Sequence, residues 1–424
     1  MDNFNAIDNA KIKPAQEKLF LLSSMGLFLD GYDLSIITMA ILVLPHQLNL
    51  NELEYILIDI SSFVGMLVGA PVLGYLSDRY GRKKIFGMDL LFFVIFAITA
   101  GLSGNFIELF LSRLFMGFGI GGDYPISSTM MSEFSPRRSR GKLLISMVGL
   151  YWFGAFIASV ANYIFVSNAY FWRYTFILGG LIAIPVILLR FKIPESPRWL
   201  SYNTSKKKDS HSLANRSSSF YKMLFLVIAA WFIFDVAAYG IGFYYPTIFS
   251  TLGFKNQFHS IAEASMLISA GGMLGYVIAL PLADKLGRRA LLIMGFAIMS
   301  GLLIVGSIIH IIGIYTVPFF FAFVLFEQWV GAITLFYPTE LFDTSVRSTV
   351  QGLATAVSRA GAIMGIVLFP LFPIFSSLGL FAIIAVIGLI IVVFLAPETK
   401  NNTLEENAAR YTGTENNNAY HFKN

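Results

Sequence analysis

The chain has 424 residues, of which 56% are hydrophobic and only 13% are charged, and its mean hydropathy is +0.70. Soluble domains are typically about one-quarter charged, so this composition excludes a water-soluble globular protein and indicates a membrane protein. The chain contains no cysteine, which excludes disulfides, thiol catalysis and cysteine-ligated metal.

Twelve apolar stretches are each long enough to cross a bilayer, which takes about 20 helical residues. In chain order they cover residues 19–45, 54–76, 85–103, 106–133, 142–168, 172–192, 221–250, 258–283, 289–311, 314–339, 346–375 and 377–396. The sequence therefore predicts an all-α membrane protein with twelve transmembrane helices, six in each half.

A polar stretch with a lysine run at 206–208 and three serines at 217–219 separates the two halves, as is typical of a linker. The expected division is a cytoplasmic N-terminal segment over 1–18, an N-terminal six-helix bundle over 19–192, a cytoplasmic linker over 193–219, a C-terminal six-helix bundle over 220–396 and a cytoplasmic tail over 397–424. The start of the chain is too polar for a cleaved signal peptide, so we expect the first span to be retained. No soluble region is large enough for an enzyme, and the five histidines show no metal or catalytic spacing. We therefore predict no enzyme activity, metal or cofactor.

Basic residues are concentrated in alternate loops. Lys11, Lys13 and Lys18 precede the first span, and basic groups recur at 79–84, 137–142, 190–208, 285–289, 347 and 400. The intervening loops hold only Arg173 and Lys255. By the positive-inside rule, both termini and the linker are expected in the cytoplasm of a multi-pass cell (plasma) membrane protein. This distribution explains the formal net charge of +5 without a nucleic-acid partner; membrane lipid is the expected surrounding.

One short charged phrase occurs twice. Asp78-Arg79-Tyr80-Gly81-Arg82-Lys83 and Asp284-Lys285-Leu286-Gly287-Arg288-Arg289 each lie between two apolar stretches, with their aspartates 206 residues apart. A loop repeated at the same place in two halves indicates an internally repeated membrane protein, the usual construction of a secondary transporter.

Ionisable residues within the spans are candidates for function, because a charge at bilayer depth costs several kcal/mol unless it is paired or hydrated. They are Asp30 and Asp33 in the first span, Arg113 and Asp123 in the fourth, Asp235 in the seventh, Glu327 in the tenth and Arg359 in the eleventh. Asp30 and Asp33 share one helix face and are expected to look into a central cavity. Trp231, Asp235 and Tyr239 are spaced by four, which places an indole, a carboxylate and a phenol on one face.

Structural explanations compete with functional ones at these positions. For Asp33, Asp235 and Arg359, deep in long spans, function is favoured over a buried ion pair that only fixes helix packing. For Asp59, Asp89, Glu108 and Glu263, nearer to the expected interfaces, a helix-end or loop partner is the favoured explanation.

A GxGxxG pattern occurs at residues 117–122, but no strand precedes it, so a dinucleotide-binding fold is not expected. Gly117 and Gly121 are four residues apart within a span, where small residues let neighbouring helices approach closely. We predict a packing role for them.

The repeated loop resembles the G-x-L-x-D-R-x-G-R-K/R signature of the major facilitator superfamily, here Gly74 to Lys83, and the likeness covers nearly the whole chain. Three further phrases resemble the sugar-porter-like branch, namely residues 194–199 (PESPRW), 347–349 (RST) and 397–400 (PETK). The second loop has Leu280 where the signature has its first glycine. The resemblance implies a conformational gate formed by Asp78, Arg79, Arg82, Glu133, Asp284, Arg288 and Glu340.

Within that branch, the phosphate:proton symporters are the most similar family. Their signatures resemble residues 119–127 of the fourth span, residues 231–240 of the seventh and the D-x-Y-D at 30–33. The resemblance implies a substrate site at Tyr124, Trp231, Asp235 and Tyr239, and proton movement through Asp30, Asp33 and Asp123. Asp33 and Arg113 also resemble the acid–arginine pair of proton-coupled sugar porters.

The chain departs from the phosphate symporters at three substrate positions. A glutamine of the fifth helix is Val148, the G-P-N of the tenth is replaced around Trp329-Val330-Gly331, and a lysine of the eleventh is Arg359. The cationic group is therefore kept while two polar ligands are missing. Arginine suits carboxylate as well as phosphate, because its planar fork can bind either in a bidentate manner.

We predict a secondary active transporter that moves a small anion, such as inorganic phosphate, across the membrane by proton symport and alternating access. Arg359 would attract the anion, and a protonated Asp235 would donate a hydrogen bond to it. The alternatives are an organic acid, since the D-G-x-D also resembles aromatic-acid:proton symporters, and a sugar, for which Tyr151, Trp152, Tyr244 and Tyr245 would offer an aromatic lining. A non-transporting nutrient sensor is a further alternative, though the linker and tail are short for one. The resemblance implies a monomer.

Overall fold

The structure is a computed structural model that describes residues 14–136, 138–204, 213, 216–252 and 257–413. The lysines at 11, 13 and 255, the lysine run of the linker and the last part of the predicted tail lie outside the described residues.

The described part of the chain is helical and contains no strand. The first half consists of α2 (Pro14–Ala40), α3 (Leu44–Gln47), α4 (Glu52–Tyr80), α5 (Arg82–Leu102), α6 (Phe106–Phe134), α7 (Arg140–Phe165) and α8 (Phe171–Arg190). The short α9 (Pro197–Thr204) follows. The second half consists of α10 (Ser218–Gly242), α11 (Tyr245–Leu252), α12 (Phe258–Lys285), α13 (Arg288–Ile309), η2 (Gly313–Tyr315), α14 (Thr316–Thr334), α15 (Tyr337–Leu341), α16 (Arg347–Leu368), η3 (Phe369–Leu371), α17 (Ile374–Leu395) and α18 (Leu404–Thr412).

Eleven of the predicted spans coincide with helices that are long and apolar enough to cross a membrane. The predicted span 106–133 is the helix α6, which is 29 residues long but falls outside this set. Its charged residues and its polar second half lower its hydropathy. The same helix is enclosed by its neighbours, because it packs along α4 and α5 and buries Arg113, Asp123 and Glu133. This charged helix is therefore largely enclosed by protein.

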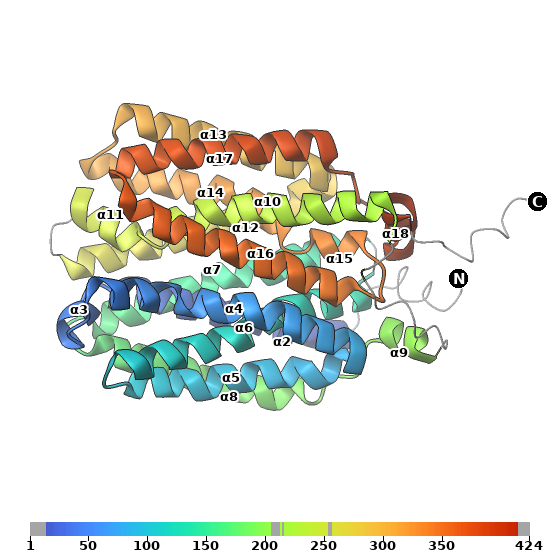
Figure 1. Cartoon of the computed structure of the whole chain (residues 1–424), viewed down its shortest axis with the longest axis horizontal. Helices are drawn as coiled ribbons and strands as arrows, with labels where there is room; N and C mark the ends of the chain where they lie inside the picture. The colour runs from blue at the N-terminus through green and yellow to red at the C-terminus, as the bar shows by residue number, and fades with distance from the viewer. Residues whose placement is uncertain (1–13, 137, 205–212, 214–215, 253–256, 414–424) are drawn as a thin grey trace, which may run out of the picture.

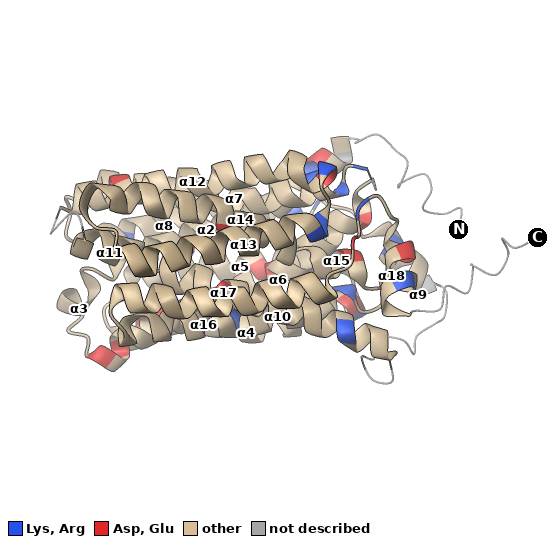
Figure 2. Cartoon of the chain, turned by 90° about the horizontal axis from the view of Figure 1, so that it is seen from above, with Lys and Arg blue, Asp and Glu red and all other residues tan. Residues whose placement is uncertain are grey.

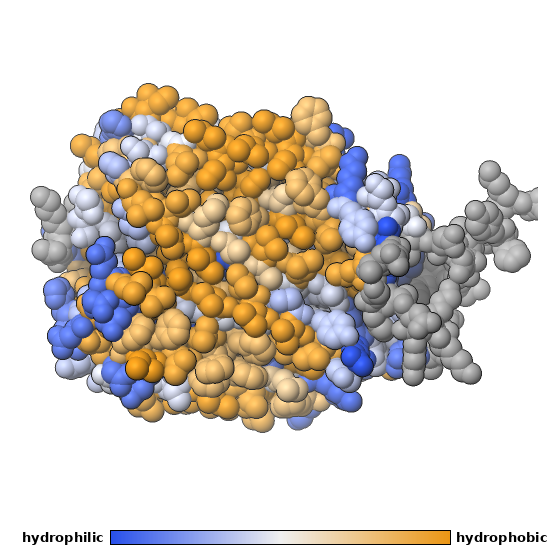
Figure 3. Space-filling view, viewed as in Figure 1, coloured by the Kyte–Doolittle hydropathy of each residue, from blue (hydrophilic) through white to orange (hydrophobic). Residues whose placement is uncertain are grey.

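The helices run roughly parallel and form two groups that face each other (Figure 1). Helices α2–α8 lie in the lower part of Figure 1 and α10–α17 in the upper part. Across the boundary α16 packs on α4 and α12 packs on α7. On the face shown in Figure 3, a band of hydrophobic side chains covers the middle, with hydrophilic residues toward both ends. This is the pattern expected of a protein whose middle contacts hydrocarbon.

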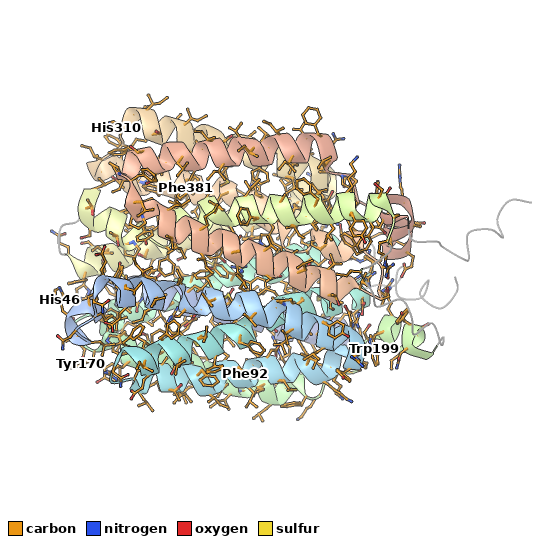
Figure 4. The ribbon with its side chains drawn as sticks, in the orientation of Figure 1. His46, Phe92, Tyr170, Trp199, His310 and Phe381 are labelled. Carbon is orange, nitrogen blue, oxygen red and sulfur yellow. The ribbon has the colours of Figure 1, made fainter. Side chains whose placement is uncertain are left out.

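The two ends of the bundle differ in charge. Most Lys and Arg residues gather at the end where α9, α15 and α18 lie, which we call the charged end (Figure 2). Trp199 lies at this end, whereas His46, Tyr170 and His310 lie at the opposite end (Figure 4). Both copies of the repeated loop are at the charged end, since one joins α4 to α5 and the other joins α12 to α13.

Four predicted spans are interrupted. The span 19–45 is divided between α2 and α3, and the span 346–375 between α16, η3 and α17. The span 221–250 is divided between α10 and α11, and the span 314–339 between α14 and α15. Pro246 and Pro338 lie at the second position of the following helix. Because proline has no N–H, it cannot donate to the carbonyl four residues earlier, which favours the break at these positions.

Candidate functional site

The first repeated loop is held by an acid from a distant part of the chain. Gly81 ends α4 and precedes α5 with a φ of 106°, a conformation that favours glycine. The Glu195 carboxylate accepts hydrogen bonds from the N–H groups of Arg82 at 3.0 Å and Lys83 at 3.2 Å. A Cβ at Gly81 would lie 2.4 Å from Glu195 Oε2. An acid at the start of α5 is favourable because free N–H groups and the helix dipole meet there.

The second loop repeats this construction. Gly287 has a φ of 100°, and Glu398 accepts from the N–H groups of Arg288 at 3.0 Å and Arg289 at 3.2 Å. Glu195 of the PESPRW phrase and Glu398 of the PETK phrase therefore have equivalent roles. Each accepts hydrogen bonds from the first N–H groups of the helix that follows the repeated loop. Sequence reasoning noted both phrases but did not connect them to the loops.

A buried ionic network joins the two halves at the charged end. Arg82 is paired with Asp78 at 2.8 Å and with Glu133 at 3.3 Å, and Arg347 reaches Glu133 at 2.9 Å. Asp78 Oδ2 also accepts from the N–H and hydroxyl of Thr349 at 2.6 and 2.7 Å. Arg347 and Thr349 belong to α16, so these contacts tie the second half to the first.

The counterpart network in the second half is weaker across the boundary. Arg288 pairs with Glu340 at 3.1 Å, and Thr399 donates to the same glutamate at 2.6 Å. Asp284 reaches across to Lys142 at 3.4 Å, but that lysine is 60% exposed, and an exposed ion pair contributes little. The predicted gate residues Asp78, Arg82, Glu133, Asp284, Arg288 and Glu340 are all in these two networks. Arg79 is not, because it is exposed and donates to Tyr75.

Helices α9 and α18 close the charged end. Arg198 Nε lies 3.1 Å from Glu405 Oε1, and Arg198 also donates to the Glu133 carbonyl. Burial raises the pKa of Glu405, but Arg198 and Arg347 outweigh burial and lower that pKa below its usual value.

A cavity lies between the two halves. Its lining includes the predicted substrate residues, which are Tyr124, Trp231, Asp235, Tyr239 and Arg359, and also Val148, Tyr151, Trp152 and Tyr245. Thr38, Ser159 and Ser265 line its other part and lie toward the ends of α2, α7 and α12 away from the charged end. The cavity therefore extends from the middle of the bundle toward the end opposite the closed networks.

Arg359 is the cationic centre of the cavity wall. Its Nη1 lies 3.7 Å from Asp235 Oδ2, and its Cζ lies 4.8 Å from the ring centroid of Tyr124 and 5.0 Å from that of Tyr239. Arg359 and Asp235 are both buried. Within the described residues, the Asp235 oxygens accept no hydrogen bond and Arg359 Nε and Nη1 donate none. The pair is thus held by charge and aromatic contact, with hydrogen-bonding capacity left over for a ligand.

Asp30 and Asp33 lie behind the cavity wall. Neither is a lining residue, so the expectation that both look into the cavity is not met; Leu27 and Leu34 of the same helix line it instead. Asp30 accepts a hydrogen bond from the hydroxyl of Tyr124. This contact connects a buried carboxylate to the ring that stacks on Arg359.

Asp33 is paired with Arg113. The Arg113 Nη1 to Asp33 Oδ1 distance is 3.3 Å, and both side chains are buried. Ser62 donates to the Arg113 carbonyl at 3.3 Å and lies 3.5 Å from Asp33 Oδ2. Asp59 is three residues before Ser62, is 1% exposed and interacts electrostatically with Arg113. From the sequence, Asp59 is expected to lie near the membrane–water interface with a helix-end or loop partner. The structure instead buries Asp59 close to the Asp33–Arg113 pair.

Asp123 occupies a different cluster. Arg190 Nη1 pairs with both Asp123 and Asp89, and Arg190 also donates to the carbonyls of Leu22 and Phe86. The sequence pattern places Arg190 among the loop cations, and in the structure it is the last residue of α8. The structure buries it instead, as the helix-end partner expected for Asp89.

The packing role predicted for the glycines of α6 is confirmed. A Cβ at Gly117 would lie 2.1 Å from the carbonyl oxygen of Ser62, and one at Gly121 would lie 2.6 Å from the Met66 backbone. Both contacts are with α4, so these glycines allow the close approach of α4 and α6.

The fold and the cavity define a multi-pass membrane transporter rather than an enzyme. The profile of the Major Facilitator Superfamily matches residues 23–366, which is most of the chain. The protein belongs to this superfamily, as the repeated loop predicted.

Curated relatives include transporters of different solutes. The inner membrane metabolite transport protein YgcS of Escherichia coli (strain K12) is 29% identical over 376 residues, covering 80% of this chain and 81% of its own. Low affinity inorganic phosphate transporter 3 of Petunia hybrida is 28% identical over 450 residues, covering 85% of this chain and 83% of its own.

Solved structures of XylE share the fold. The proton:xylose symporter XylE bound to 6-bromo-6-deoxy-D-glucose superposes with a TM-score of 0.80 at 21% identity, covering 93% of this chain and 99% of its own. An inward open conformation of XylE from E. coli gives a lower TM-score of 0.70 at 19% identity.

Proposed function

We propose that this protein is a proton-coupled symporter that carries a small anion across the cell membrane by alternating access. The observation that carries the proposal is the Arg359–Asp235 pair in the wall of the cavity between the two halves. The arginine attracts an anion, while the adjacent carboxylate repels it unless it holds a proton. Anion and proton are therefore favoured together, which is the requirement for symport.

Inorganic phosphate is the first candidate for the anion. The phosphate transporters among the relatives support it, as does the cluster of Tyr124, Trp231, Asp235 and Tyr239 at one cavity. An organic acid is the second candidate, and the aromatic lining favours it. Val148 and Gly331 supply no polar group to a phosphate, and Tyr151 and Trp152 offer ring surfaces.

Asp33 and Arg113 form the proposed proton-coupling element, with Asp30 connected to the cavity through Tyr124. Protonation of Asp33 removes its attraction for Arg113 and allows α2, α4 and α6 to change their packing. Asp123 acts with them through Arg190 in this proposal.

The gate closes the charged end in the present state. We propose that this end is cytoplasmic, that α6 completes a set of twelve spans, and that the halves meet at a linker over 193–219. The basic loops at the charged end support this orientation. Release of the substrate into the cytoplasm then requires the contacts of Asp78 and Glu133 with α16 to break. We propose that the monomer is the working unit.

The test is uptake of labelled phosphate into proteoliposomes with and without an inward proton gradient, with unlabelled carboxylates and sugars as competitors. Accumulation that depends on the gradient and is lost in Asp235→Asn supports the proposal with phosphate as substrate. Competition by a carboxylate in the absence of phosphate uptake moves the substrate to the second candidate. Transport of a neutral sugar with unchanged affinity in Arg359→Gln would contradict the anion site.

A further inference from the structure

Glu327 is a buried acid of the cavity that the proposed coupling does not use. It lies on α14, lines the cavity and is 2% exposed. One carboxylate oxygen accepts from the side chain of Gln328 at 2.7 Å. The other, Oε2, has no hydrogen-bond partner among the described residues.

The hydroxyl of Tyr245 lines the same cavity and also has no partner among the described residues. Its ring packs on Phe320, which precedes Glu327 by two helical turns on α14. The phenol and the acid thus belong to one polar patch of the cavity wall, formed by α11 and α14, whereas Arg359 and Asp235 come from α16 and α10.

The charges of the cavity lining do not balance. Asp235, Glu327 and Arg359 are its charged residues, so one positive side chain faces two acids. If Asp235 takes the coupled proton, as in the proposed function on which this inference rests, one positive and one negative charge remain. A bare inorganic anion would satisfy Arg359 but offer Glu327 no cation, so Glu327 would have to hold a proton of its own to stay buried.

Aromatic side chains occupy the wall near Glu327. Gly331 follows it by one turn, and a Cβ there would meet the Phe234 ring at 2.9 Å and the Tyr276 hydroxyl at 3.2 Å. Phe234 precedes Asp235 on α10 and also lines the cavity, so a ring lies beside the arginine pair and beside the turn of α14 that follows Glu327. A ligand that reaches both needs an apolar body between its two polar ends.

We propose that Glu327 is a second recognition site of this cavity, which selects the second candidate of the proposed function, an organic acid, in the form of a zwitterion that also carries a protonated amine. Its anionic group binds Arg359, its protonated amine binds Glu327, and a carbon chain or ring spans the aromatic wall. This substrate class balances the charges that a proton on Asp235 leaves in the cavity.

The test measures ligand binding to the purified full-length protein. Binding is detected as a change in tryptophan fluorescence, because Trp152 and Trp231 line the cavity. The probes are unbranched ω-amino acids from 3-aminopropanoate to 6-aminohexanoate, the matching n-alkanoates without the amine, and inorganic phosphate. We expect at least one amino acid to bind about tenfold more tightly than its alkanoate, as a desolvated charge pair predicts. Equal binding of the two series at every length, or no binding of either, overturns the proposal.

Two substitutions assign the effect to this residue. In Glu327→Gln the advantage of the amine should fall to within about twofold while alkanoate affinity is kept. Glu327→Asp retains the charge but is one methylene shorter, so the preferred amino acid should become one methylene longer. This length shift is a readout that a merely structural role would not give, and thermal unfolding of both variants checks their folding. An unchanged amine preference in both variants overturns the proposal.

Arg359→Gln separates this inference from the function on which it rests. If that substitution weakens both series and Glu327→Gln changes neither, only the role of Glu327 is wrong. If Arg359→Gln leaves the alkanoates and phosphate unaffected, the anion site itself is wrong.

Discussion

Arg359 and Asp235 face each other across 3.7 Å in the wall of the cavity, both buried and neither hydrogen-bonded to the other. At this distance the pair is too loose for a direct hydrogen bond, so its members remain available to a ligand. A tight bidentate pair would have satisfied both groups and closed the site. The looseness is what makes the pair suitable for binding an anion together with a proton.

Asp235→Asn is expected to abolish gradient-driven accumulation while substrate exchange across the membrane persists. The amide keeps the size and a hydrogen-bond donor but cannot release a proton. Uptake into proteoliposomes measures the accumulation, and counterflow measures the exchange. The matched control is Glu263→Gln, which neutralises an exposed acid. Accumulation at the wild-type level in Asp235→Asn would contradict a coupling role.

Arg113 has a second acid available when Asp33 is protonated. Its Nε and Nη2 have no partner among the described residues, and Asp59 Oδ1 is likewise without one. Asp33→Asn should therefore lose uphill accumulation, whereas Asp59→Asn should slow transport several-fold and keep the gradient dependence. Initial rates and steady-state accumulation distinguish the two effects. Identical behaviour of the two variants would mean that Arg113 does not move from Asp33 to Asp59 during transport.

The contacts of Asp78 with Thr349 hold the charged end closed. A hydrogen bond to a charged group contributes about 1.5–3 kcal/mol, so Thr349→Val should shift the conformational equilibrium toward opening at that end by about tenfold or more. The chain has no cysteine, so Ser265→Cys in the cavity provides a single labelling site. Its reaction with a membrane-impermeant thiol reagent, added at the end opposite the charged one, should slow in the Thr349→Val background. An unchanged labelling rate would show that these contacts do not control the gate.

Gly117→Val should destabilise the first half. A Cβ at position 117 would lie only 2.1 Å from the Ser62 carbonyl oxygen of α4, so the valine side chain would clash with that helix. Such overpacking costs about 1–3 kcal/mol of stability. Gly301→Val is the matched control, because nothing lies within 4 Å of a Cβ at that position. Thermal unfolding in detergent should show a lower midpoint for Gly117→Val alone. Equal midpoints for the two variants would contradict the close packing of α4 and α6.

The Arg198–Glu405 contact should make the closure by α9 and α18 sensitive to acid. The pKa of Glu405 is lowered from 4.5 in the folded protein, so its ionised form contributes stability above that value and loses it as the pH falls through the lowered pKa. Glu405→Gln should therefore be less stable than the wild type near pH 7. The difference should shrink as the pH falls below 4.5 and through the lowered pKa of Glu405. Protease susceptibility of the charged end, measured against pH, checks both points.

Sequence by itself determined the class of protein and much of its plan. Span length and hydrophobicity are local properties, so eleven membrane helices could be located from composition alone. The repeated loop predicted two related halves, and glycine at 81 and 287 is explained by backbone conformation at those positions. The spacing of Trp231, Asp235 and Tyr239 placed all three on one face, and all three line the cavity.

Only the tertiary structure decided which charges meet. Arg347 and Glu133 are 214 residues apart, and Arg190 reaches Asp123 from 67 residues away. Such pairings depend on how helices from both halves pack, which no local pattern encodes. The same packing withdraws Asp30 and Asp33 from the cavity and leaves Glu327 facing it with an unpaired oxygen, because burial and partners are properties of the assembled bundle.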